Sequence, residues 1–166
     1  QKIIVTAHCN TTIGESGTLA FRLQPNHTTD NLDGIMVSLM EGFSYGAGDA
    51  VLGLNPVIDT VESVGNVLKM FDEFKRKWEI PTQTCVLAHV TTQMEAIKKG
   101  APADLMFQSI AGSQKGNEAF GFTLDTLREA QELMERYSTA TGPNYFYFET
   151  GQGSELSSDA HHGADQ

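Results

Sequence analysis

Short apolar runs alternate along the chain with longer segments in which apolar residues recur every three or four positions. The short runs predict β-strands, and the recurring pattern predicts amphipathic helices between them. The expected strands cover residues 18–23, 50–54, 85–90, 105–110 and 145–149. The expected helices begin near residues 32, 61, 93 and 124. This strand-then-helix order predicts parallel strands joined by right-handed crossovers.

The second helix has the clearest apolar stripe of the chain. One face of it carries Val61, Val64, Leu68, Phe71 and Trp78. Asp59 and Glu62 stand three residues apart at its start, which predicts a capping box there. Residues 111–121 contain glycine and are expected to form the loop before the last helix, whose inner side carries Leu124, Leu127, Met134 and Tyr137.

The predicted fold class is α/β, as part of a (β/α)8 TIM barrel. No strand is followed by the Gly-x-Gly-x-x-Gly turn of a dinucleotide-binding fold. A barrel needs about 200 to 250 residues, so this chain would supply strands 1–5 with their intervening helices. Residues 1–166 are therefore expected to be the amino-terminal portion of one barrel domain, with 154–166 as a loop or frayed end. The chain opens on Gln1 and stops without a closing element, which suggests a piece of a longer protein.

Composition narrows the function further. The formal net charge of −10 argues against binding to nucleic acid, because phosphate recognition needs a cationic face. No apolar run is long enough to span a bilayer. The two cysteines, Cys9 and Cys85, suggest buried thiols in a reducing compartment.

The fifth predicted strand is the most unusual stretch. Its aromatic run ends on a carboxylate, followed by a glycine-rich turn. Alternation along a strand places Tyr145, Tyr147 and Glu149 on one face and Phe146 and Phe148 on the other. Glu149 is then either a packing partner or the acidic centre of a site.

Polar side chains gather where the predicted strands end. These residues are Arg22, Gln24, Asn55, His89, Gln108 and Glu149. In barrels the carboxyl ends of the strands together form the active site. Taken singly, each of them is expected simply to meet water at a strand end, and His89 reads as a satisfied core histidine.

The chemistry that this rim can carry is restricted. The sequence has no Cys/His/Asp set at zinc spacing and no Gly-x-Ser-x-Gly turn around a serine nucleophile. One carboxylate, one arginine and neutral amides suit a small polar molecule that carries a cation and a hydroxyl. Difficult bond-making would require a cofactor.

Six blocks of sequence resemble the large, catalytic subunit of ethanolamine ammonia-lyase. They are Asn10-Thr11-Thr12-Ile13-Gly14, Arg22-Leu23-Gln24-Pro25-Asn26, Gly48-Asp49-Ala50-Val51 with Asn55-Pro56, Cys85-Val86-Leu87-Ala88-His89-Val90-Thr91-Thr92-Gln93, Phe107-Gln108-Ser109-Ile110 and Tyr147-Phe148-Glu149-Thr150-Gly151-Gln152-Gly153-Ser154. The resemblance implies a (β/α)8 barrel that uses adenosylcobalamin to convert ethanolamine to acetaldehyde and ammonia. It implies no metal held by side chains, since cobalamin carries its own cobalt.

The resemblance also implies roles for individual residues. Arg22, Asn55 and Glu149 would hold the substrate hydroxyl, and Gln24 and Glu149 its ammonium group. Glu149 and Arg22 are thereby the expected catalytic pair. The expected cobalamin contacts are Pro56, Gln108 and Ser157.

Two features depart from the family pattern. Glu118 and Ala119 leave uncertain the register of an acidic residue associated with the adenosyl group. Asp159-Ala160-His161-His162-Gly163 is one residue short of the Asp-x-His-x-x-Gly cobalamin motif, so its histidines read as solvated loop residues.

The resemblance implies a small subunit as partner, an oligomer of large subunits, and a cytoplasmic location associated with a bacterial microcompartment. The isolated chain is expected to be inactive, because strands and a second substrate carboxylate are missing. One alternative is a barrel hydrolase using Glu149, which needs a second carboxylate; Asp49 and Asp104 lie toward the other strand ends. The other alternative is a non-catalytic binding or assembly subunit.

Overall fold

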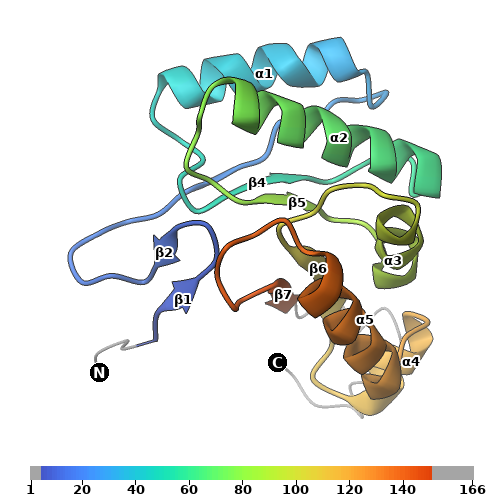
Figure 1. The fold of residues 1–166 in the computed structure, drawn as a ribbon. Coiled ribbons are helices and arrows are strands. Elements are labelled where there is room, and N and C mark those ends of the chain that lie inside the picture. Colours follow the sequence, from blue (N-terminus) through green and yellow to red (C-terminus); the bar gives the residue numbers. More distant parts are fainter. Residues whose placement is uncertain (1–4, 151–166) are drawn as a thin grey trace, which may run out of the picture.

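The computed structural model describes residues 5–150 of the chain and has a mixed α/β architecture. This part contains seven short strands and five helices, rather than the five strands and four helices expected. Figure 1 shows the helices around a set of mostly parallel strands.

Five of the strands run in two parallel groups. β3 (Arg22–Leu23), β4 (Val51–Leu54) and β5 (Thr84–Val86) form one sheet in that order. β6 (Met106–Ile110) and β7 (Phe146–Thr150) form another. The Leu105 backbone N–H donates to the Thr84 carbonyl at 3.1 Å, so β6 follows β5 at the edge between the groups. Neighbours in space are thus neighbours in sequence, as parallel strands with helical crossovers require.

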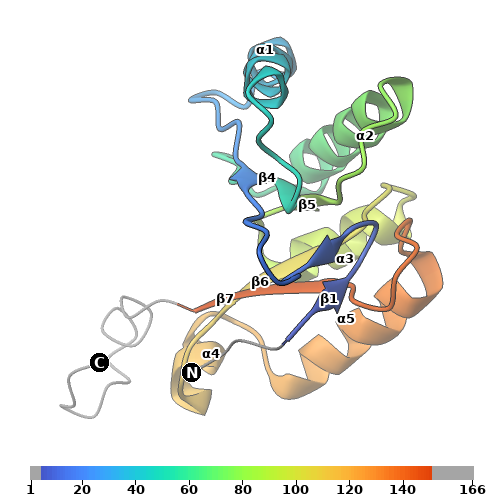
Figure 2. The ribbon, with the colours of Figure 1, turned by 90° about the vertical axis from the view of Figure 1, so that its left-hand side faces the viewer.

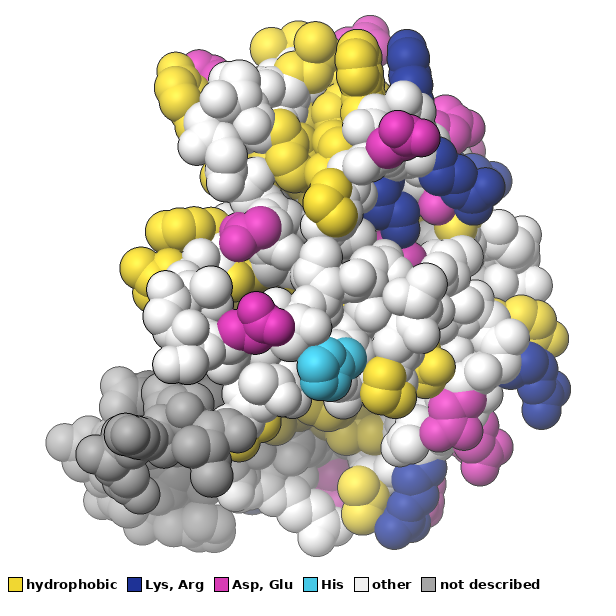
Figure 3. Space-filling view, turned by 60° about the vertical axis from the view of Figure 1, so that its left-hand side comes forward, with side chains coloured by type: hydrophobic (Ala, Val, Ile, Leu, Met, Phe, Trp, Pro, Cys, Tyr) yellow, Lys and Arg dark blue, Asp and Glu magenta, His cyan; other side chains and the backbone are white. Residues whose placement is uncertain are grey.

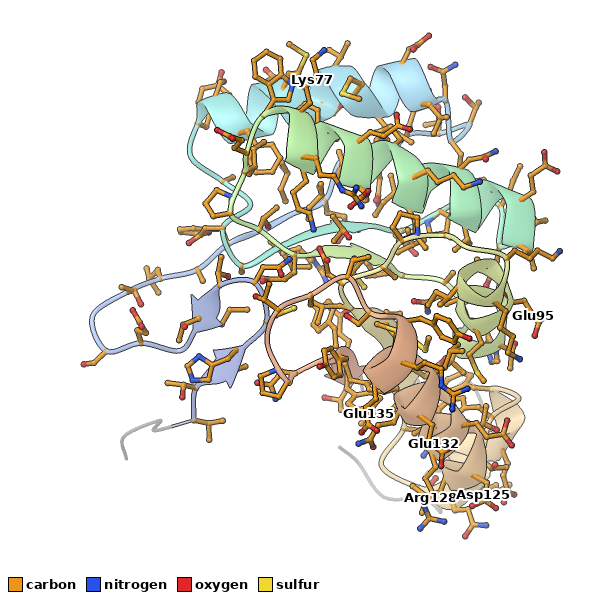
Figure 4. All side chains as sticks on the ribbon, in the orientation of Figure 1. Lys77, Glu95, Asp125, Arg128, Glu132 and Glu135 are labelled. Atoms are coloured by element: carbon orange, nitrogen blue, oxygen red, sulfur yellow. The ribbon has the colours of Figure 1, made fainter. Side chains whose placement is uncertain are left out.

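Five helices connect and cover these strands. They are α1 (Leu32–Ser44), α2 (Val61–Lys77), α3 (Val90–Lys98), α4 (Gln114–Ala119) and α5 (Leu124–Tyr137). In the two views of Figures 1 and 2, α1 and α2 lie over β4 and β5, whereas α3 and α5 lie beside β6 and β7. The outer side of α5 is strongly charged: Asp125, Arg128, Glu132 and Glu135 project from it in Figure 4.

The strands have an apolar core on each face. On the helix-covered face, Leu52, Leu54, Val86 and Met106 pack with the buried sides of the helices. A smaller cluster on the opposite face contains Cys9, Val51, Cys85, Leu105 and Phe107. Odd and even strand residues divide between the two clusters because successive side chains point to opposite faces. We refer to the face that carries the smaller cluster as the helix-free face.

An amino-terminal hairpin, which the apolar pattern did not predict, docks against the start of the strands. It consists of β1 (Ala7–His8) and β2 (Thr12–Ile13), paired antiparallel. Gln83 Oε1 accepts the backbone N–H groups of Asn10 and Thr11, each at 3.1 Å. With two residues per strand, the hairpin depends on such polar contacts, and a hydrophobic period could not indicate it.

Several predicted boundaries are wrong for identifiable reasons. Only Arg22 and Leu23 of the run 18–23 pair as a strand. The run 85–90 leaves the sheet after Val86, because His89 becomes the N-cap of α3. The loop 111–121 contains α4, whose N-cap is Ser113.

Two predictions about helices also fail. The N-cap of α2 is Thr60, which accepts from the Ser63 N–H at 3.2 Å, whereas Asp59 instead accepts from the His89 N–H at 2.8 Å. Asp59 and Glu62 therefore do not form the capping box. The ends of two predicted apolar stripes are exposed: Trp78, Leu124 and Tyr137 are 57%, 63% and 52% accessible.

Hydrophobic side chains also remain exposed along α1. Val37 and Met40 are 66% and 55% accessible, and Tyr45 just after the helix is 80% accessible. Figure 3 shows hydrophobic side chains gathered at the end of the molecule where α1 lies. No helix in residues 5–150 is long and apolar enough to cross a membrane.

Candidate active site

Arg22, Tyr147 and Glu149 meet on the helix-free face of the strands. Arg22 Nη1 lies 2.5 Å from the Tyr147 hydroxyl oxygen. The same nitrogen lies 3.2 Å from Glu149 Oε2 and 3.4 Å from Oε1. Two of the predicted site residues, one near each end of the chain, are thus in direct contact.

This contact requires the strands to curve. β3 carries Arg22, β7 carries Glu149, and three strands lie between them. At about 4.8 Å per strand spacing, a flat sheet would hold β3 and β7 about 19 Å apart. An arginine and a glutamate side chain together cannot bridge that separation. The strands therefore curve toward the helix-free face, bringing Arg22 and Glu149 together.

A glycine in β4 makes room for the arginine. Arg22 pairs in register with Val51, and Gly53 is the next residue of β4 on the same face. A Cβ atom built on Gly53 would lie 3.4 Å from Arg22 Cδ and 3.1 Å from Leu87 Cδ1. The arginine stem therefore runs across Gly53, toward the carboxyl end of β4.

The ion pair is only partly shielded from water. The Arg22 and Glu149 side chains are 28% and 43% accessible. Within residues 5–150, Nη1 is the only guanidinium nitrogen of Arg22 that donates a hydrogen bond. Its Nη2 and Nε groups, and lone pairs of the carboxylate, remain able to bind a small polar molecule.

Burial also affects the phenol. It raises the pKa of Tyr147, and the nearby negative charge of Glu149 adds to the effect, whereas Arg22 opposes it. Tyr147 is therefore neutral near pH 7, and its oxygen accepts a hydrogen bond from the guanidinium.

The loop after β4 carries two further predicted site residues. Asn55 is exposed and its backbone N–H donates to Asn26 Oδ1 at 2.9 Å. Pro56 is half-buried. Asp30 holds the loop just beyond them, because its two carboxylate oxygens accept from Val57 N–H at 2.9 Å and Ile58 N–H at 2.8 Å. Asp30 has a φ of 51°, in the left-handed region that few residues other than glycine adopt.

Gln24 and Gln108 differ in how deeply they are buried and in the hydrogen bonds of their side-chain amides. Gln24 is half-buried just after β3, two residues from Arg22. Gln108 is buried, and its amide is engaged with the backbone: Oε1 accepts from Val90 N–H at 2.8 Å, and Nε2 donates to the Ser109 carbonyl at 2.9 Å. Within the part of the chain that the structure describes, neither residue hydrogen-bonds the Arg22–Glu149 pair.

His89 has a structural role. As N-cap of α3 it accepts from Thr91 N–H through Nδ1, and its Nε2 lies 2.7 Å from the Phe120 carbonyl oxygen. Its ring packs against Phe122 of the helix-side core. The histidine is hydrogen-bonded as expected, but its ring is half-buried and does not belong to the core.

A hollow adjoins these residues at the carboxyl ends of β5 and β6. It has a volume of about 290 Å³ and is lined by Leu87, Ala88, His89, Phe107, Gln108, Ser109 and Phe120. Most of this lining is apolar, with His89, Gln108 and Ser109 as its polar members.

Ser157 lies outside the described residues, as do Asp159, His161 and His162. Among residues 5–150 no group of three or more His, Cys, Asp or Glu side chains is arranged to hold a metal ion.

The two carboxylates considered as partners of Glu149 in a hydrolase lie elsewhere. Asp49 Oδ1 accepts from the Phe21 backbone N–H at 2.8 Å. Asp104 is fully buried at the opposite, amino-terminal end of the strands, 2.5 Å from Lys75 Nζ. Neither Asp49 nor Asp104 is therefore the second carboxylate that a hydrolase would need beside Glu149.

Sequence reasoning did not identify Tyr147 and Asp30 as parts of the site. The spacing of two residues along one strand predicts that Tyr147 shares the face of Glu149. The same spacing predicts this face for Tyr145, which is wrong: Tyr145 precedes β7 and packs against the helix-side core. Asp30 had no sequence signal beyond its position in a turn.

Fold and site together define a class of protein: a parallel α/β protein with a half-buried arginine–carboxylate site on the helix-free face of its strands. The family model described as ethanolamine ammonia lyase large subunit matches residues 1–166. The chain is 52% identical over 166 residues to the ethanolamine ammonia-lyase large subunit of Salmonella typhimurium strain LT2, and equally to that of Escherichia coli strain K12. The chain belongs to the ethanolamine ammonia-lyase large subunit family. These 166 residues cover 37% of the length of each relative.

Proposed function

We propose that this chain is the first half of a (β/α)8 TIM barrel whose remaining strands lie in further residues of the large subunit. The curvature between β3 and β7 and the sequential order of the parallel strands support closure into a barrel. The exposed apolar residues of α1, Val37 and Met40, would be covered by a neighbouring helix of the completed ring. The coverage of 37% of each relative leaves the length for such a completion.

The proposed activity is that of an ethanolamine ammonia-lyase, which releases acetaldehyde and ammonia from ethanolamine. The observation that carries this proposal is the Arg22–Glu149 pair at 3.2 Å. A guanidinium donates to the substrate hydroxyl, and a carboxylate attracts the substrate ammonium, so one pair matches both ends of the molecule. Asn55 would add a contact to the hydroxyl, and Gln24 one to the ammonium group.

These residues contribute binding and orientation rather than bond-breaking. Glu149 has oxygens enough to accept from the substrate hydroxyl and the ammonium group together, which fixes both carbon atoms between them. Arg22 pairs with Glu149 through Nη1, so that Nη2 and Nε would be the groups that donate to the substrate. Closing the site around the substrate excludes water and so strengthens each of these contacts.

Apolar surface near the ends of β4 and β6 supports adenosylcobalamin as the proposed cofactor. Pro56 precedes Val57 and Ile58, which are 62% and 50% accessible and present an apolar edge. The hollow beside Gln108 offers an apolar lining with an amide at its wall. Pro56, Gln108 and Ser157 would hold the cofactor, with Gln108 acting from a fixed position because its amide is already engaged. When bound, adenosylcobalamin supplies radical chemistry by homolysis of its cobalt–carbon bond.

The proposed partners are the small subunit, which would complete the cobalamin site, and other copies of the large subunit. The proposed location is the cytoplasm, in association with a bacterial microcompartment. The net charge of −10 argues against a nucleic-acid partner.

The variant Glu149→Gln in the full-length large subunit tests the proposal. Together with the small subunit, adenosylcobalamin and ethanolamine, the unmodified protein should produce acetaldehyde and an organic radical coupled to low-spin cobalt in electron paramagnetic resonance spectra. Glu149→Gln removes the charge that binds the ammonium group, and turnover should fall at least about 1,000-fold, on the order of 4 kcal/mol of transition-state stabilisation.

A matched substitution separates the site from general effects. Glu132→Gln changes an exposed glutamate of α5 and should keep turnover within twofold. Cobalamin uptake, followed by absorbance, should be equal in both variants. Turnover by Glu149→Gln near the level of the unmodified protein would contradict the assignment of Glu149.

A further inference from the structure

Tyr147 contacts Arg22 through two parts of its side chain. The hydroxyl oxygen lies 2.5 Å from Arg22 Nη1. The guanidinium carbon lies 5.7 Å from the centre of the Tyr147 ring. No other side chain among residues 5–150 hydrogen-bonds Arg22 except Glu149.

The ring of Tyr147 is itself held in place. It packs edge-to-face on Phe107, with ring centres 5.6 Å apart and an angle of 63° between the planes. Phe107 is buried in the cluster of the helix-free face, together with Cys85. The phenol is therefore a fixed point on the sheet, whereas Glu149 is 43% accessible and stands near the end of its strand.

This difference determines which partner can orient the arginine. Glu149 accepts from Nη1 at 3.2 and 3.4 Å, through a single nitrogen rather than by the two-nitrogen fork that fixes a guanidinium plane. A single long contact to a partly exposed carboxylate leaves the plane free to turn. The shorter bond to the anchored phenol restricts it, and the arginine stem packs over Gly53.

We propose that Tyr147 is a positioning residue that fixes Arg22 through Nη1, so that Nη2 and Nε face the hydroxyl of the substrate. This inference rests on the proposed function, since it assigns to Arg22 the binding of ethanolamine. Tyr147 acts through Arg22 and is not assigned a contact with the reacting atoms.

The variant Tyr147→Phe isolates the hydroxyl. The ring and its packing on Phe107 remain, and only the oxygen that accepts from Arg22 is lost. Tyr145→Phe is the matched control, because Tyr145 is half-buried on the helix side and its hydroxyl makes no hydrogen bond within residues 5–150. Both variants are made in the full-length large subunit, assembled with the small subunit and adenosylcobalamin.

Tyr147→Phe should raise the KM for ethanolamine at least fivefold and lower kcat at least fivefold, because a loosened guanidinium both binds and aligns the hydroxyl less well. Tyr145→Phe should change each value less than twofold, and the Tm values of the two variants should agree within a few degrees. A purely structural role would lower the amount of folded protein without moving the KM. A crystal structure of Tyr147→Phe should show Arg22 displaced from its position over Gly53.

One outcome would contradict the positioning role of Tyr147 alone, and another would contradict the proposed function as well. If the unmodified protein converts ethanolamine and Tyr147→Phe keeps both KM and kcat within twofold, the positioning role is wrong and the proposed function stands. If the unmodified, fully assembled protein does not convert ethanolamine, the proposed function fails, and the inference that rests on it fails as well.

Discussion

Each end of the strands contains a lysine or arginine paired with an acid. The two pairs differ in the distance between the charged atoms and in the exposure of the side chains. Lys75 and Asp104 meet at 2.5 Å, with side chains 14% and 0% accessible. Arg22 and Glu149 meet at 3.2 Å, with side chains 28% and 43% accessible. The first pair lies at the amino end of the strands and the second on the helix-free face at their carboxyl end.

The difference lies mainly in how fully each acid is satisfied. Asp104 also accepts from Thr84 N–H at 2.9 Å and from Thr139 Oγ1 at 2.7 Å, so its hydrogen-bonding capacity is used within the fold. Glu149 accepts only from Arg22 among the described residues. A buried charge must be fully paired, whereas a partly exposed pair can keep capacity for a ligand. The amino end thus stabilises the fold, and the carboxyl end is left able to bind.

The largest effect on stability is expected from Asp104→Ala. This change leaves Lys75 without its partner in a buried setting and frees the Thr84 N–H, and removing one member of a buried pair costs about 3–5 kcal/mol. Asp125→Ala is the control, because Asp125 and Arg128 form an exposed pair on α5 (Figure 4) whose loss costs less than about 1 kcal/mol. Urea unfolding of the full-length protein measures both, and equal midpoints would contradict the contrast.

A smaller effect on stability is expected from a change at Asp30, which holds the loop after β4. Asp30→Asn keeps a side chain that tolerates the φ of 51° but can accept only one of the two N–H groups of Val57 and Ile58. Both hydrogen bonds are exposed, so water can satisfy the freed N–H group, and the change should cost about 0.5–1.5 kcal/mol. The KM for ethanolamine should rise a few-fold, since Asn55 and Pro56 lie in the same loop. The control is Asp33→Ala, a change at an exposed residue in the first turn of α1, which should leave the KM unaltered. If the KM of Asp30→Asn were also unaltered, the loop would have no part in substrate binding.

The smallest effect on stability is expected from a change of pH, in the alkaline range. Burial raises the pKa of the Cys9 thiol from about 9 to about 11, and burial also raises the pKa of Cys85 and of Tyr147. Because the folded state holds these protons more tightly than the unfolded chain, their contribution to stability is complete below pH 9. It is lost as the pH rises through 11.

Thermal unfolding between pH 7 and 11 checks this expectation. The Tm should be level up to about pH 9 and fall above it, and Cys9→Ser should reduce the slope of that fall. A Tm that rises between pH 9 and 11 would reverse the sign and contradict the prediction. Near neutral pH both thiols should react slowly with an alkylating reagent, since the reactive thiolate is scarce.

Much of this architecture could be predicted from periodicity. The apolar spacing located α1, α2 and α5, and alternation along β7 correctly separated Phe146 and Phe148, whose rings stack 5.0 Å apart, from Tyr147 and Glu149. Boundaries were less predictable where a polar side chain competed for the backbone. Val90 has the apolar character of a strand residue, but capping by His89 places it in the first turn of α3.

The sequence by itself determined the alternation of strands and helices, the family to which the chain belongs, and the polar residues available at the strand ends. Only the tertiary structure decided which of those residues meet: Arg22 and Glu149 do, Gln108 is used by the backbone, and Tyr147 joins the pair. The physical reason is that periodicity is a local property of the chain. The distance between Arg22 and Glu149 depends instead on the curvature of all the strands between them, and on the space left by Gly53.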